Sequence, residues 1–194
     1  MKQASSRELF SYWVARRGTR SAPERGEIEP SAIRRALGDV FILEFDRAGG
    51  HPFRLAGTRV CALFGRELKN ARFLDLFDSE SRAAIGDLLD AIADDAAGAV
   101  ASAKGHTPEG WAQDVELTLL PLAHRGDTHA RMIGTLAPLT APFWLGTAKL
   151  GGLTLGNVRH LDPAMEAPTA ARLVAANPAA ARRATFTVVE GGRQ

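Results

Sequence analysis

The chain has 194 residues, of which 45% are hydrophobic and 24% are charged. This composition is typical of a globular protein and excludes a chain that is disordered throughout. The length allows one well-buried domain with extensions. The 24 Lys+Arg residues against 22 Asp+Glu residues leave a net charge of +2, which is too small to indicate nucleic-acid binding.

Cysteine usage and the apolar segments indicate a cytoplasmic protein. The single cysteine, Cys61, can form neither an internal disulfide nor a zinc site made of cysteines. Residues 1–8 lack the apolar stretch of a secretory signal. The longest apolar segment, residues 136–155, is interrupted by prolines, glycines and a lysine, so it cannot span a bilayer. We therefore expect a cytoplasmic protein with no membrane span.

The first predicted element is an amphipathic helix. Ser5 and Glu8 have the spacing of a capping box, and Gly18 suits the end of the helix. A second short helix is predicted for residues 30–37, because it opens on a proline and is followed by a glycine. We assign residues 1–38 to an N-terminal helical segment. The apolar stripe of its first helix contains Leu9, Phe10 and Trp13.

From residue 40 the sequence changes to a strand pattern. Residues 40–45 and 52–56 are predicted to be paired strands, because β-branched and aromatic residues flank a segment of turn-forming residues. Thr58 and Gly65 then bound a short helix. The next predicted elements are another helical turn and a longer helix that Asp78 caps.

Three further strands complete the predicted core, at residues 98–104, 114–119 and 129–139. Because helices and strands do not alternate along the chain, this order predicts an α+β fold in which helices cover a five-stranded antiparallel sheet. We assign residues 39–140 to this core. Residues 141–194 are predicted to be a C-terminal extension that is partly irregular.

Three stretches of the core resemble a known family. They are Phe53-Arg54-Leu55-Ala56-Gly57-Thr58, Cys61-Ala62-Leu63-Phe64-Gly65-Arg66-Glu67-Leu68 and Phe73-Leu74-Asp75-Leu76. These stretches resemble a PAS-like domain family of alphaproteobacteria, and the resemblance extends over residues 5–160. It implies a PAS-like sheet with flanking short helices behind an N-terminal helical segment. It also implies a sensory or regulatory role, and it brings no catalytic residues with it.

The resemblance also gives expectations about cofactors. Residues Asn70-Ala71-Arg72-Phe73-Leu74 are similar to the photoactive flavin-binding branch of PAS domains, in which a cysteine stands at the position of Ala71. Without that thiol we expect no photoactive flavin. Haem-binding PAS domains carry a histidine on the long helix, and residues 79–97 contain none. We therefore expect no haem either, and the cofactor stays unknown.

A PAS cavity would lie between the inner face of the sheet and the short helices. Apolar residues at such spacing line a ligand pocket in some proteins and simply fill the core in most. Arg59 is a candidate anchor for an anionic ligand, although such arginines more often lie on the surface. The predicted ligand-binding residues are Phe41, Leu43, Leu55, Arg59, Cys61, Phe64, Phe73, Phe77, Leu117, Met132 and Leu136.

The sequence contains no recognisable catalytic or metal-binding set. It has no nucleophile elbow, phosphate-binding glycine loop or His-Glu-x-x-His motif. His124 and His129 flank a turn, but no carboxylate or thiol is placed to complete a metal site with them. The arginine pairs are separated and interspersed with acidic residues, so we expect no nucleic-acid partner.

Two aromatic segments are predicted interfaces. An amphipathic helix with an aromatic stripe, here Leu9, Phe10 and Trp13, can dock on its own sheet or pair with a second copy. Resemblance to PAS proteins favours a homodimer through this flank. Phe143 and Trp144 form the second candidate interface.

These observations leave three hypotheses for the function. The preferred one is a non-catalytic sensory or regulatory protein in signal transduction, which binds a small ligand, a signalling protein or both. The second is an interaction scaffold with a closed core. The third is a small α+β enzyme, which requires polar groups such as His106 or Asp114 to face a cavity.

Overall fold

The computed structural model describes residues 1–161, except for the side chains of Thr128 and His129. The rest of the predicted C-terminal extension, residues 162–194, lies outside the described residues. The elements, in which η marks a short 3₁₀ helix, follow in the order α1 (Ala4–Arg17), η1 (Arg25–Glu27), η2 (Pro30–Ile33), β1 (Val40–Glu44), β2 (Phe53–Ala56), α2 (Thr58–Phe64), η3 (Phe73–Leu76), α3 (Ser79–Asp95), β3 (Gly98–His106), β4 (Ala112–His124), β5 (Asp127–Pro138) and β6 (Leu153–Leu161).

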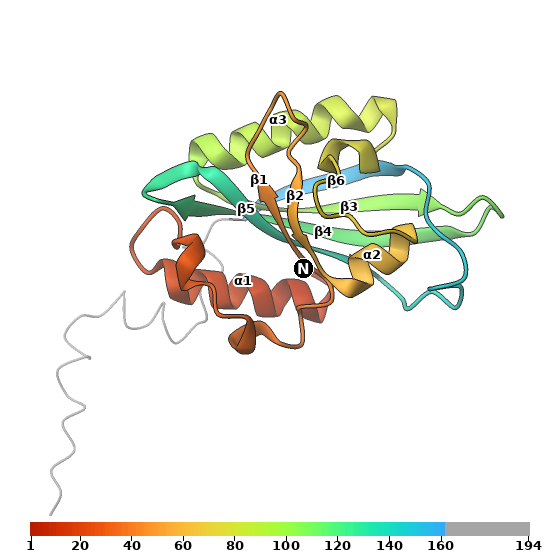
Figure 1. The fold of residues 1–194 in the computed structure, drawn as a ribbon, viewed down its shortest axis with the longest axis horizontal. Coiled ribbons are helices and arrows are strands. Elements are labelled where there is room, and N and C mark those ends of the chain that lie inside the picture. The colour runs from red at the N-terminus through yellow and green to blue at the C-terminus, as the bar shows by residue number, and fades with distance from the viewer. Residues whose placement is uncertain (162–194) are drawn as a thin grey trace, which may run out of the picture.

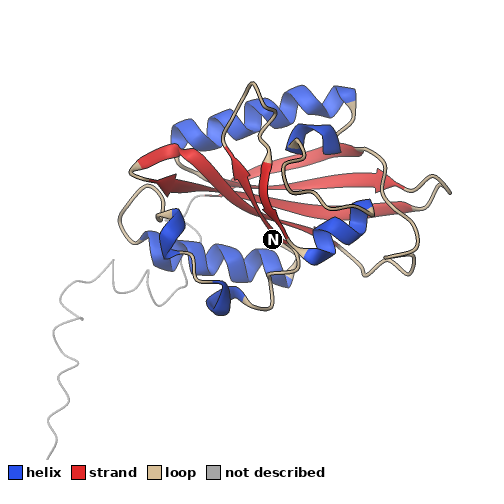
Figure 2. Ribbon diagram, viewed as in Figure 1, coloured by secondary structure: helices blue, strands red, loops and turns tan. Residues whose placement is uncertain are grey.

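The strands form one six-stranded sheet in the order β2-β1-β5-β4-β3-β6. Every neighbouring pair is antiparallel. Figure 1 shows α3 on one side of this sheet and α1 on the other, and Figure 2 shows the same view with helices in blue and strands in red. The α+β fold with an antiparallel sheet is therefore confirmed, and all five predicted strands are present.

The sixth strand, β6, is an addition to the predicted sheet. It lies within the segment assigned to the C-terminal extension and pairs with β3 at the edge. The start of α3 also holds it, because the Asp78 N–H donates to Leu153 O at 3.0 Å and the Leu155 N–H donates to Ser81 Oγ at 2.8 Å. The strand therefore depends on partners far away in the sequence.

Both faces of the sheet are covered, and β1 shows how the sequence achieves this. Phe41 and Leu43 belong to the cluster beneath α2, η3 and α3, which we call the inner face. Val40 and Ile42 belong to the cluster beneath α1 and η2, which we call the outer face. Successive strand residues point to opposite faces, so a continuous apolar run fits a strand that is buried on both sides.

A carboxylate from the sheet caps α1. The Glu116 carboxylate accepts hydrogen bonds from the Lys2 N–H at 2.6 Å and the Gln3 N–H at 3.0 Å. The predicted capping box is wrong, because the cap residue is Gln3 and no side chain of the helix makes a capping hydrogen bond. Glu116 satisfies backbone donors that a local cap would otherwise serve.

The predicted end of α2 and the predicted start of α3 are confirmed. Gly65 ends α2 in the left-handed conformation with φ 60°, as a C-terminal glycine should. Asp78 caps α3 by accepting a hydrogen bond from the Ser81 N–H at 2.8 Å, which confirms that prediction. The helix predicted at residues 30–37 is shorter, because only η2 forms there.

Candidate functional site

Four phenylalanines fill the space between the inner face and the short helices. Phe41 comes from β1, Phe53 from β2, Phe73 from η3, and Phe77 follows η3. The Phe73 ring centroid lies 5.4 Å from that of Phe41, 5.6 Å from that of Phe53 and 5.4 Å from that of Phe77. Each of these side chains is at most 2% exposed. Three of these residues, Phe41, Phe73 and Phe77, were predicted to line a cavity, and their rings pack directly against one another.

The backbone around β2 places these rings. The Phe53 N–H donates to Ala71 O at 2.9 Å, and the Asn70 N–H donates to Phe53 O at 2.8 Å. Asn70 has a φ of 65°, a conformation that asparagine tolerates better than most residues. This turn returns the chain to the sheet immediately before Phe73, so the Phe73 ring enters among the other three.

The predicted ligand-binding residues divide into two groups. One group belongs to the inner-face cluster, with Cys61 partly buried at its margin. Arg59 and Leu55 lie elsewhere, and Phe53, at the centre of the ring cluster, was not predicted as a lining residue. The cluster members among the predicted residues are Phe41, Leu43, Phe64, Phe73, Phe77, Leu117, Met132 and Leu136.

A register shift separates Leu55 from Phe53. Between β1 and β2, Leu43 is paired with Phe53 and Ile42 with Leu55, so two residues of β2 are spanned by one step of β1. Because Ile42 faces outward, Leu55 faces outward as well, where it is 42% exposed. The strict alternation of an undisturbed strand would have placed Phe53 and Leu55 on the same face.

Arg59 is engaged outside the ring cluster. Its guanidinium donates to the Asp39 carboxylate through Nε at 2.6 Å and through Nη2 at 2.9 Å. The hydrogen bond to Asp39 raises the pKa of Arg59. Asp39 is only 6% exposed, so this pair ties the start of α2 to the segment before β1. The structure thus gives Arg59 a structural partner within the chain.

The residues predicted as interfaces are mostly buried within the chain. Leu9, Phe10 and Trp13 pack on the outer face, and Trp13 Nε1 donates to Pro121 O at 2.8 Å. Trp144 is 2% exposed and belongs to the inner-face cluster. Phe143, by contrast, is 81% exposed. Among the predicted interface residues, Phe143 is therefore the one whose side chain is exposed.

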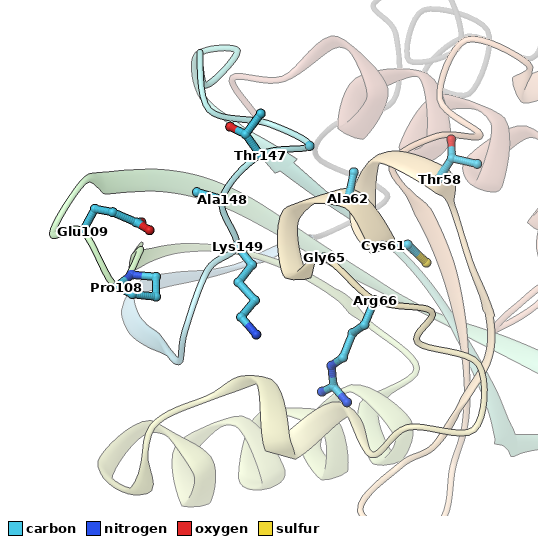
Figure 3. Close-up of a pocket in the computed structure, with 11 residues that line it drawn as sticks. Thr58, Cys61, Ala62, Gly65, Arg66, Pro108, Glu109, Thr147, Ala148 and Lys149 are labelled. Atoms are coloured by element: carbon cyan, nitrogen blue, oxygen red, sulfur yellow. The ribbon is translucent and has the colours of Figure 1, made fainter.

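A groove of about 560 Å³ lies on the surface beside α2. We call it the α2 groove. Its walls come from α2 with the adjoining Gly65 and Arg66, from Pro108 and Glu109 in the β3–β4 turn, and from residues 146–149 (Figure 3). Cys61 is the one predicted ligand-binding residue that lines it, and burial raises the pKa of its thiol. The groove is open to solvent and separate from the ring cluster.

Two of the polar groups considered for catalysis lie on the surface. His106 and Asp114 are exposed on the outer face, where Asp114 pairs with Lys104 at 3.6 Å. Within residues 1–161, no group of three or more His, Cys, Asp or Glu side chains is arranged to hold a metal ion. The His129 side chain lies outside the described part. No helix in the described part is long and apolar enough to cross a membrane.

His51 is a buried histidine that was not among the predicted site residues. It is 2% exposed, has a φ of 55° and lies with its ring centroid 5.0 Å from that of Phe45. Burial lowers its pKa from the ordinary value of 6.5. The signal in the sequence was weak, because a histidine within turn-forming residues looks like any exposed loop residue.

The fold defines the class of protein: a strand pair, short helices, one longer helix and an antiparallel group of strands, as in PAS domains. A model of the PAS domain family matches residues 1–137. The chain therefore belongs to the PAS domain family. This membership fits a sensory or regulatory role.

Two solved structures are similar to the chain. The Rhodobacter sphaeroides LOV protein matches with 20% identity and a TM-score of 0.41, covering 56% of this chain and 66% of that one. An RNA-binding light-oxygen-voltage receptor matches with 24% identity and a TM-score of 0.41, covering 61% of this chain and 36% of that one. A search of the curated proteins finds no match.

Proposed function

We propose that this chain is a non-catalytic regulatory PAS domain with a closed core, which signals by contacting a protein partner through its surface. The observation that carries the proposal is the ring cluster of Phe41, Phe53, Phe73 and Phe77. Their centroids lie 5.4–5.7 Å apart in four pairs, within the range of packed aromatic rings. An internal ligand would have to displace rings that already pack against one another.

The placement of polar groups supports the non-catalytic part of the proposal. A cavity enzyme needs acids, bases or nucleophiles that converge on an enclosed space. Here His106 and Asp114 face away from the inner-face cluster, and Arg59 is paired with Asp39. The residues that face the short helices from the sheet are apolar, which suits a rigid core that transmits contacts between surfaces.

Native mass spectrometry of the freshly purified full chain tests the closed core. We expect the folded protein to have the mass of the bare polypeptide. A small molecule retained at one copy per chain, whose removal lowers the melting temperature, would overturn the closed-core proposal. It would favour the alternative of a ligand-binding sensor.

A photo-crosslinking amino acid, incorporated into the chain and activated in the cells that produce the protein, tests whether the surface contacts a protein partner. Phe143 is one position for it, and Ser11, exposed on α1, is a second position on another surface. We expect a discrete crosslinked protein from at least one of the two sites. The absence of any discrete adduct from both would contradict signalling through a protein partner.

A further inference from the structure

Two exposed aromatic side chains meet at one end of the molecule. Among residues 1–161, four large hydrophobic side chains are exposed, and the two aromatic ones, Phe143 at 81% and Trp111 at 40%, contact each other. Their ring centroids are 4.9 Å apart with an interplanar angle of 63°. We call them the aromatic pair. Tryptophan and other aromatic residues dominate the energetics of protein interfaces, so such a contact on the surface indicates a binding site.

The chain holds both rings of the aromatic pair in place. Trp111 closes the β3–β4 turn, where the Thr107 N–H donates to Trp111 O at 3.0 Å and the Gly110 N–H donates to Thr107 O at 2.9 Å. Phe143 precedes Trp144, whose buried side chain anchors this segment in the inner-face cluster. A binding surface that is fixed beforehand loses little conformational entropy when a partner binds.

The aromatic pair and the α2 groove are built from the same two segments. The β3–β4 turn supplies Trp111 to the pair and Glu109 to the groove, while the segment after β5 supplies Phe143 to the pair and Lys149 to the groove. Two backbone hydrogen bonds fix the second segment, from the Leu150 N–H to Leu63 O at 2.7 Å and from the Gly151 N–H to His106 O at 2.9 Å. Figure 1 shows both segments at the same end of the sheet, next to α2.

The charges of the α2 groove favour an acidic partner. Arg66 and Lys149 both line it and are exposed, and neither side chain forms a hydrogen bond or ion pair with another described residue. In Figure 3 these two side chains extend toward the same side, whereas Glu109 lies on the β3–β4 turn. Two exposed cations on one side provide a site for a carboxylate, which arginine can bind with two parallel hydrogen bonds.

We propose that the aromatic pair and the α2 groove together bind a peptide segment of a partner protein that carries an acidic side chain close to an apolar one. The acidic side chain pairs with Arg66 and Lys149, and the apolar side chain packs against Trp111 and Phe143. This inference rests on the proposed function, since it names the kind of partner that a closed-core PAS domain contacts.

A phage-displayed library of random peptides, selected against the full chain, tests the chemistry of this site. We expect the enriched peptides to combine Asp or Glu with Leu, Ile, Phe or Trp. Fluorescence anisotropy of a selected peptide should show binding that weakens as salt is added, because the charges are exposed. Enrichment of basic peptides, or of peptides without acidic residues, would overturn the proposal.

Four variants locate the binding. Lys149→Glu and Phe143→Ser should each weaken the selected peptide at least about tenfold, the effect of a hot-spot side chain. The matched controls are Lys69→Glu, an exposed cation outside the groove, and Leu55→Ser, an exposed leucine on the outer face. Both controls should leave the affinity within about twofold, as substitutions away from the contact do. Equal effects in all four variants would refute the site.

Other occupants of the site give different results. A homodimer seen by sedimentation velocity and abolished by Phe143→Ser would assign this surface to a second copy and overturn the peptide proposal. Binding of inorganic phosphate that is lost in Lys149→Glu, without peptide binding, would assign the groove to a small anion. In both cases the closed core is tested separately, by the native mass of the purified chain.

Discussion

Truncation of Phe73 gives the sharpest test of the closed core. Phe73→Ala removes a fully buried ring that contacts Phe41, Phe53 and Phe77. Such truncations destabilise a protein by about 3–5 kcal/mol, because apolar transfer energy is lost and a cavity remains. For a chain of this size, about 4 kcal/mol lowers the melting temperature by roughly 10 °C. Phe143→Ala, the same substitution at a side chain 81% exposed, should change stability by less than about 0.5 kcal/mol.

Benzene distinguishes a closed core from a pre-existing cavity. The Phe73→Ala variant should contain a dry cavity on the order of 100 Å³ lined by aromatic rings, and such cavities bind small apolar molecules. Benzene at ten times its dissociation constant should then stabilise the variant by about 1.4 kcal/mol. Urea denaturation with and without benzene measures this difference. If benzene stabilises the natural protein as much as the variant, the core already has a cavity and our reasoning is refuted.

Three further predictions concern His51, two glycines and Glu116. Burial lowers the pKa of His51 from 6.5, so the unfolded chain binds more protons than the folded one, and stability should fall as the pH drops below about 6.5. Asparagine tolerates the positive φ at this position. Urea denaturation of His51→Asn should therefore show a weaker pH dependence than that of the natural protein. Gly57→Ala should destabilise the protein by about 1–3 kcal/mol, because the added Cβ would lie 2.3 Å from a backbone oxygen. Gly86→Ala, which has open space around it in α3, should stabilise the protein by up to about 1 kcal/mol. The melting temperatures of the two variants should therefore shift in opposite directions. Glu116→Ala should speed hydrogen exchange at the start of α1 and cost about 1–3 kcal/mol, and exchange rates unchanged from the natural protein would refute its role as a cap.

The elements governed by local signals were predictable from the sequence. The start of α3 follows from Asp78, whose carboxylate reaches a backbone N–H three residues later. The end of α2 follows from Gly65, because glycine adopts the left-handed conformation without steric cost. The alternation in β4 placed Val115, Leu117 and Leu119 on one face, and all three belong to the inner-face cluster.

Features that depend on distant residues were not predictable in this way. β6 requires β3 and the start of α3 as partners. Gly156 within it, and Gly151 and Gly152 just before it, weaken the strand pattern in the sequence. The outward position of Leu55 results from a register shift between β1 and β2 that no neighbouring residue in the sequence predicts. The α2 groove joins three segments separated along the chain, so its cations, Arg66 and Lys149, look in the sequence like ordinary solvated charges.

The attachment of α1 also has a consequence for the order of events during synthesis. Trp13 donates its indole hydrogen bond to Pro121, a residue 108 positions later in the chain. At about 5–20 residues per second, a ribosome needs about 5–20 s to make that interval. Throughout this time the apolar side of α1 lacks the strand on which it later packs. The nascent chain therefore exposes Leu9, Phe10 and Trp13 for seconds, which makes its first helix the natural target of a chaperone that binds emerging chains.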